Sequence, residues 1–142
     1  MKANEIEKVM VAIDGSKNSL RAGKLAVNIA KNSGSQLIIM SVIVRPSYMV
    51  SQPQYFSAAR RKLHKRWNDR VLKLARSEGV KVSAQILQSS SVVKSLLDFA
   101  ASKEVDLIVV GTRGLGTFKR LIVGSVSSAV VYHATCSVLV VR

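Results

Sequence analysis

The sequence alternates short apolar runs with stretches of helical periodicity. Continuous apolar runs, typical of strands buried on both faces, occur at residues 9–13, 36–44, 106–110 and 138–141, and the run at 80–86 alternates apolar and polar residues. Such alternation with short connections predicts an α/β fold: a doubly wound, five-stranded parallel sheet with helices on both faces. A chain of 142 residues is about one domain long, so residues 1–142 are expected to form a single domain.

The segments between the apolar runs carry helix signals. Apolar residues between Ala22 and Ala30 recur at helical spacing, and Gly34 follows as a stop. Ser57 is expected to cap a helix that ends near Gly79, and Ser91 to cap the next one. Residues 45–56 hold both prolines and no clear period, so a loop is expected there.

Basic residues dominate the charge of the chain. There are 22 Lys and Arg against 8 Asp and Glu, a formal net charge of +14, which favours contact with polyanions such as nucleic acid, nucleotides or anionic membranes. Eight basic residues lie between Arg60 and Arg76. They form either a solvated helix face, the commoner case, or a nonspecific nucleic-acid contact. No apolar run approaches the roughly 20 residues of a membrane span, and the charged start of the chain favours a cytoplasmic location.

A glycine cluster follows the apolar run at 106–110. Gly111, Gly114 and Gly116 lie within six residues, and Gly124-Ser125 opens a helix-like stretch further on. Glycines allow close approach of the backbone, and the free N–H groups of a helix start suit a phosphate. Ordinary turn glycines are the alternative interpretation. Arg113 within the loop either pairs with a phosphate or points into water.

The turn Asp14-Gly15-Ser16 follows the first apolar run. It is either a helix cap or part of a ligand site, because these residue types are common in turns and caps. Ligands of doubly wound sheets bind at the carboxyl ends of the strands where the strand order reverses. Asp14 and Gly111 are therefore candidates for the same crevice.

The sequence lacks the motifs of several kinds of metal, nucleotide and catalytic site. The single cysteine, Cys136, precedes an apolar run and is expected to be a buried thiol. His64 and His133 have no partners at metal-ligand spacing. The chain also lacks a Walker loop, a Gly-x-Gly-x-x-Gly loop after the first strand and a Gly-x-Ser-x-Gly elbow. Catalysis is therefore not the leading expectation, and any ATP hydrolysis should be slow.

Gly111-x-x-Gly114, nine further residues and Gly124-Ser125 resemble the nucleotide loop of the universal stress protein family, with apolar runs on both sides. The resemblance extends to Val9–Ser16 and to Met40-Ser-Val42. It implies strand order 3-2-1-4-5, a fold like that of adenine-nucleotide α-hydrolases and, in the ATP-binding branch, a site between the first and fourth strands. Two departures are Ser90-Ser91-Val92 and Cys136-Ser137-Val138, where many members have Gly-Asp-Pro and Cys-Pro-Val.

The resemblance also implies roles for individual residues. Those bordering the adenosine would be Ala12, Asp14 and Val42, with Asp14 near the ribose. Those on the far side would be Val110, Gly111, Arg113 and Gly114, and those binding phosphates would be Gly124, Ser125, Val126 and Ser127. The ligand would be ATP, ADP or AMP, with Mg²⁺ able to accompany the nucleotide.

We therefore expect a stress-response sensor or regulatory module that binds ATP or a related adenine nucleotide. The alternatives are a nonspecific nucleic-acid-associated protein that uses the helix at 57–77 and a dimeric scaffold without nucleotide. A homodimer through residues 138–141 is expected, because this apolar edge strand lacks the charges, proline or bulge that protect exposed edges. Dimers through this strand are also frequent in the family that the chain resembles.

Overall fold

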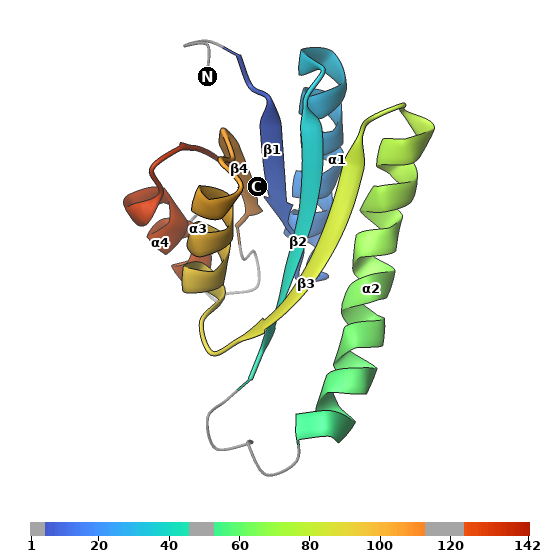
Figure 1. Ribbon diagram of the computed structural model, residues 1–142, viewed down its shortest axis with the longest axis vertical. Coiled ribbons are helices and arrows are strands. Elements are labelled where there is room, and N and C mark those ends of the chain that lie inside the picture. Colours follow the sequence, from blue (N-terminus) through green and yellow to red (C-terminus); the bar gives the residue numbers. More distant parts are fainter. Residues whose placement is uncertain (1–4, 46–52, 113–123) are drawn as a thin grey trace.

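The computed structural model describes residues 5–45, 53–112 and 124–142 (Figure 1). In chain order the elements are β1 (Lys8–Ala12), α1 (Lys17–Ser33), β2 (Gln36–Val44), α2 (Pro53–Ser77), β3 (Val82–Ser89), α3 (Val92–Ser102), β4 (Leu107–Gly111), α4 (Ser125–His133) and β5 (Ser137–Val141). Every strand pair is parallel, and the order across the sheet is β3-β2-β1-β4-β5. The predicted doubly wound α/β fold and its strand order are confirmed.

Helices cover both faces of the sheet, with α1 and α2 on one face and α3 and α4 on the other (Figure 1). Successive side chains of a strand point to opposite faces. In β1, Val9 and Val11 therefore pack into the core under α1 and α2, whereas Met10 packs under α3 and α4. All three are fully buried, which explains why β1 reads as an unbroken apolar run.

The element ends test the sequence-based boundaries. β2 spans Gln36–Val44 as predicted, and Gly34 ends α1 in the left-handed conformation with φ 67°. Ser91 caps α3 by accepting a hydrogen bond from Lys94 N at 3.2 Å. The alternating strand β3 lies at an edge of the sheet, one of the two positions that its pattern indicated, but it spans Val82–Ser89 instead of the predicted 80–86.

The predicted start of α2 is wrong. The helix begins at Pro53, so residues 53–56 are helical and not part of a loop, and Ser57 lies inside the first turns instead of capping them. Proline suits the first helical position, because its φ is already helical and its missing N–H would have no partner there. The described helices include none that is both long and apolar enough to span a membrane.

Candidate functional site

The carboxyl ends of β1 and β4 lie side by side at the centre of the sheet. The chain moves from β1 outward to β2 and β3 and returns to the other side of β1 at β4, so the strand order reverses here. A cavity of about 140 Å³ opens at this point. Its lining comprises Ala12, Ile13, Asp14, Ser19, Met40, Val42, Val44, Val92, Leu96, Val110, Gly111, Gly124, Val126 and Ser127.

Most of the predicted site residues meet at this cavity. Those that line it are Ala12, Asp14, Val42, Val110, Gly111, Gly124, Val126 and Ser127. Ser125 is the first residue of α4 and is exposed outside the lining. Arg113 and Gly114 lie outside the described residues.

Sequence reasoning missed six lining residues: Ile13, Ser19, Met40, Val44, Val92 and Leu96. Ser19 lies one turn after the cap Ser16, and its Oγ accepts a hydrogen bond from Asp14 N at 3.3 Å and donates to Ser16 O at 3.0 Å. The spacing of three residues between Ser16 and Ser19 could have indicated that Ser19 belongs to the capped turn. Val92 follows the recognised cap Ser91, so its place at the start of α3 was also readable.

The turn after β1 is both a helix cap and a wall of the cavity. Asp14 Oδ1 accepts a hydrogen bond from Ser16 N at 2.9 Å, and Ser16 Oγ accepts one from Ser19 N at 3.1 Å. Gly15 between them has φ 83°, a left-handed conformation that favours glycine. The cap interpretation is therefore correct, and the same turn places Asp14 in the lining of the cavity.

The opposite wall is built by close contact between the end of β4 and the first turn of α1. A Cβ at Gly111 would lie 2.6 Å from the carbonyl carbon of Asn18, which is backbone and cannot swing away. Thr112 N donates to Val141 O at 2.8 Å, which ties the end of β4 to β5. Gly111 is thus required by the approach of α1, whatever the site binds.

The N-terminus of α4 forms the third side of the cavity. Gly124 precedes the helix with φ −68° and ψ 169°, and no side chain of the described residues caps the first turn. The first N–H groups of a helix have no intrahelical partner, and the helix dipole makes this end attractive to anions. The Ser127 hydroxyl is buried and donates to Gly124 O at 3.1 Å. Among the described residues, the backbone N–H groups of the first turn and the exposed Ser125 hydroxyl are therefore the donors that suit a phosphate.

The cavity offers little to a metal ion. Asp14 is the one carboxylate in its lining, and the described part of the chain contains no cluster of three or more His, Cys, Asp or Glu that could hold a metal. Mg²⁺ bound through protein usually also uses substrate phosphates and water. Any Mg²⁺ here would depend mainly on phosphate oxygens of a ligand.

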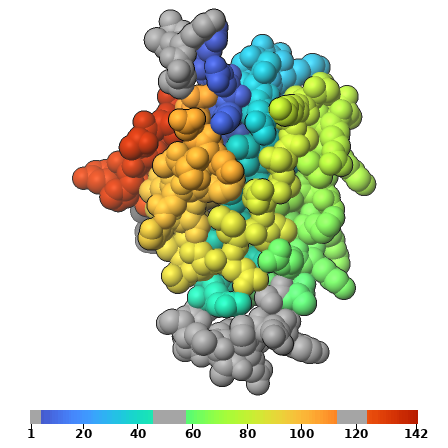
Figure 2. Space-filling view, viewed as in Figure 1, coloured from blue at the N-terminus to red at the C-terminus, as the bar shows by residue number. Residues whose placement is uncertain are grey.

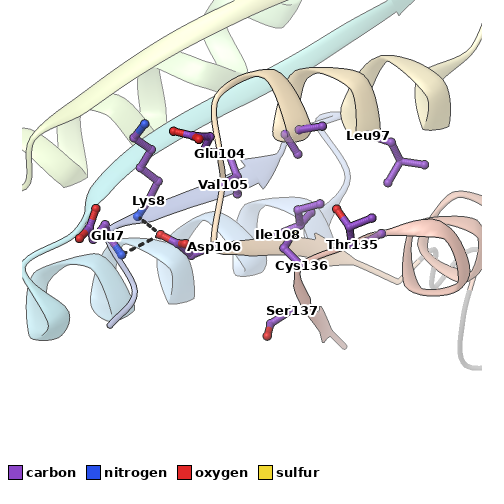
Figure 3. Close-up of a pocket in the computed structure, with 13 residues that line it drawn as sticks. Glu7, Lys8, Leu97, Glu104, Val105, Asp106, Ile108, Thr135, Cys136 and Ser137 are labelled. Carbon is purple, nitrogen blue, oxygen red and sulfur yellow. Dashed lines mark hydrogen bonds between the residues drawn. The ribbon is translucent and has the colours of Figure 1, made fainter. Parts of the chain in front are cut away.

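A larger cavity of about 730 Å³ lies at the opposite end of the sheet, between α3, the starts of β1 and β4 and the α4–β5 turn (Figure 3). Asp106 accepts hydrogen bonds there from Glu7 N and Lys8 N, both at 2.9 Å. The lining includes three carboxylates but only one ammonium, that of Lys8. Burial raises the pKa of the half-buried Cys136 thiol in this wall, which disfavours the reactive thiolate. The charge balance disfavours a phosphate, so size alone does not make this the nucleotide site.

Comparisons with known proteins agree with the fold. The profile of the universal stress protein family matches residues 5–142. A putative universal stress protein of Staphylococcus epidermidis is 37% identical over 140 residues, covering 94% of this chain and 82% of the relative. The structure of a universal stress protein in complex with cAMP is 29% identical, with TM-score 0.72 over 97% of this chain and 98% of that one. UspA from Lactobacillus plantarum shares the fold, with TM-score 0.83 and 24% identity over 97% and 99% of the two chains.

Proposed function

The chain belongs to the universal stress protein family, and from this premise we propose that it binds an adenine nucleotide in the cavity between the ends of β1 and β4. The observation that carries the proposal is the meeting of Asp14, an apolar wall and the N-terminus of α4 around one cavity. The relative solved with cAMP, at 29% identity, supports an adenine nucleotide as the ligand class.

Each part of the cavity suits one part of the nucleotide. Ala12, Val42 and Val110 offer apolar surface to the base, and Asp14 accepts hydrogen bonds from the ribose hydroxyls. The N–H groups after Gly124 bind the phosphates, with Arg113 and Gly114 contributing from the loop. The cavity of about 140 Å³ is smaller than common ligand pockets of about 300–1,000 Å³, but its lining reaches from the end of β1 to the N-terminus of α4, the two ends that the proposed nucleotide would bridge.

The proposed role is that of a sensor or regulatory module of the stress response in the cytoplasm. Among the described residues that line the cavity, Asp14 is the only titratable one. General acid–base chemistry normally uses a positioned side chain whose pKa lies near the working pH, so hydrolysis of bound ATP is expected to be slow. The signal would then be the occupancy of the site by ATP, ADP or AMP.

Two measurements test the proposal. Freshly purified protein is denatured, and the released small molecules are identified by mass spectrometry; an adenine nucleotide is expected. Calorimetric titration of nucleotide-free protein with ATP, ADP and AMP should show saturable binding, with GTP as the control for the base. Absence of both a released adenine nucleotide and calorimetric binding would contradict the proposal.

We also propose that two copies pair through β5. This strand lies at the end of the sheet, and its apolar residues Val138–Val141 are half-buried rather than fully covered. An unprotected apolar edge favours pairing with another strand. Sedimentation equilibrium at micromolar concentration should give the mass of a dimer, and a monomer would refute the pairing.

A second candidate function rests on α2. Its eight basic residues between Arg60 and Arg76 are all exposed, and Lys62, Arg66, Arg70 and Lys73 follow one stripe at helical spacing. One of the eight, Lys65, forms an ion pair with Asp69. The helix α2 lies along one flank of the molecule (Figure 2). This face suits nonspecific contact with the phosphates of nucleic acid.

A further inference from the structure

The helix α2 touches the turn that carries Asp14. The Trp67 indole lies against Gly15, so that a Cβ at Gly15 would be 2.2 Å from Trp67 Cε2. The left-handed φ of Gly15, 83°, and the missing side chain let the ring occupy this place. The residue directly before this glycine is Asp14, so Trp67 restrains one side of the carboxylate-bearing turn.

A second contact restrains the other side. Asn68 is only 2% exposed, and its Oδ1 lies 2.7 Å from Ser41 Oγ. Ser41 Oγ is in turn 2.8 Å from the carbonyl oxygen of Ile13, the residue before Asp14. Ser41 Oγ has only one hydrogen, so it donates to Ile13 O, and the Asn68 amide holds the hydroxyl when it is turned so that Nδ2 donates to Ser41 Oγ. This orientation also gives a partner to the buried Nδ2. Buried polar groups are costly to leave without partners, so the line from Asn68 through Ser41 to Ile13 resists displacement.

Asp14 is therefore bracketed by contacts from two consecutive residues of one helix. The Asn68 chain reaches the residue before it, and the Trp67 ring covers the residue after it. The part of α2 that follows Asn68 is itself held in place, because Val71 and Ala75 are buried in the core shared with α1 and the sheet. A shift of α2 cannot occur without disturbing the turn.

We propose that Trp67 and Asn68 are positioning residues of the nucleotide site, which hold the Asp14 turn in its binding conformation and couple α2 to the occupancy of the site. The inference rests on the proposed nucleotide function. Neither residue lines the cavity, so both act through the turn. By linkage, a nucleotide that binds better when the turn is held must also stabilise the contact between Trp67 and Gly15.

The test is a double-mutant cycle on AMP affinity, measured by calorimetry. Trp67→Ala should weaken AMP binding about tenfold or more, whereas Trp67→Phe, which keeps an aromatic ring at the glycine, should stay within about threefold of the parent. In an Asp14→Asn background, Trp67→Ala should weaken binding less than about threefold further, because the group it positions is already altered. Equal effects in both backgrounds would overturn the proposal.

Leu74→Ala is the matched control. Leu74 also lies on α2 and packs against the same core, about two helical turns after Trp67. It should lower stability in denaturant unfolding while leaving AMP affinity unchanged. A loss of AMP affinity in Leu74→Ala equal to that in Trp67→Ala would mean that Trp67 acts only through general stability, and would overturn the proposal.

Wild-type protein gives an independent readout that needs no variant. Trp67 is the only tryptophan of the chain, so tryptophan fluorescence reports the surroundings of this one ring, which include the contact with Gly15 and an edge contact with His64. Saturating AMP should shift or quench the emission with the same Kd as calorimetry. If AMP binds calorimetrically but the emission does not change, the coupling is refuted while the nucleotide function stands. If AMP, ADP and ATP all fail to bind, the nucleotide function fails and this inference fails with it.

Discussion

The side chain of Asn18 donates hydrogen bonds to both oxygen atoms of Thr112, the backbone carbonyl and, at 3.1 Å, the hydroxyl. These residues are 94 positions apart in the chain. The contact fixes the first turn of α1 against the end of β4, next to Gly111. It sets the position from which the chain enters the glycine loop, so the candidate site depends on a junction between the two halves of the fold.

Gly111→Ala should destabilise the fold itself. Its Cβ would meet Asn18 backbone at 2.6 Å, and overpacking of this kind costs about 1–3 kcal/mol. Gly34→Ala is the matched control, because Gly34 has φ 67° with no atom within 4 Å of its Cβ position; it should cost only about 1 kcal/mol of backbone strain. Urea unfolding measures both. A Gly111→Ala protein as stable as the parent would contradict the close-approach argument.

Gly124→Val should abolish adenine-nucleotide binding and leave the fold largely intact. The backbone at Gly124, φ −68° and ψ 169°, is open to any residue, so valine adds no strain there. Its branched side chain would stand where phosphate approaches the helix N-terminus. Calorimetry with ATP and circular dichroism measure the two effects. The same result is expected for Gly114→Val, which lies outside the described residues.

Ser125→Ala provides the milder comparison at the same helix start. The exposed hydroxyl is lost, but the backbone N–H donors remain. Loss of a hydrogen bond to a charged group should weaken binding by about 1–3 kcal/mol. If folded Gly124→Val and Ser125→Ala proteins both bind ATP like the parent, the N-terminus of α4 does not hold the phosphates.

Asp14→Asn should weaken nucleotide binding about tenfold to a hundredfold, the size expected for a charge-assisted hydrogen bond. Asparagine keeps an oxygen that can accept from Ser16 N, so the turn should persist. Calorimetry gives the affinity, and thermal unfolding shows whether the turn survives. Unchanged affinity would remove Asp14 from the proposed ribose contact.

The His64 imidazole should make stability depend on pH. Burial and, to a smaller extent, the nearby Arg60 charge lower the pKa of His64 below 6.5, and the Asp14 charge raises it by less. The unfolded chain then takes up the proton first, so stability is fully present above pH 6.5 and falls as the pH drops through the folded pKa. The free energy of unfolding is measured in urea at roughly unit pH steps between pH 8 and pH 5. It should depend less on pH in His64→Phe than in the parent protein. Parallel profiles would contradict this.

Binding of nucleic acid by α2 should be weak, steeply salt-dependent and indifferent to sequence. Each phosphate neutralised contributes about 0.9 to the slope of log K against log salt, so Arg66→Gln with Arg70→Gln should reduce the slope by up to about 2. Lys24→Gln with Lys81→Gln removes equal charge from exposed positions elsewhere and should change the slope less. A sequence bound tightly while its scrambled version is rejected would refute the nonspecific contact.

Local patterns in the sequence determined the secondary structure and the class of fold. The unbroken run at 9–13 indicated a strand covered on both faces, and the alternation at 80–86 indicated an exposed or edge strand, because burial on one or two faces dictates which positions must be apolar. Gly34 and Ser91 marked helix ends for reasons confined to a single turn. The strand order came from the family resemblance, since periodicity says nothing of which strands are neighbours.

Tertiary packing alone decided how the site residues are held. No sequence pattern relates Gly15 to Trp67, Ser41 to Asn68, or Gly111 to Asn18, because these contacts join elements that only the folded sheet brings together. The sequence marked Gly111 as a ligand-loop glycine, whereas its missing side chain is needed first by α1. Ser127 had the right residue type for a phosphate, yet its hydroxyl donates to Gly124 O within its own helix. Residue type follows from local chemistry, but the direction and partner of a side chain follow from distant chain segments packed against it.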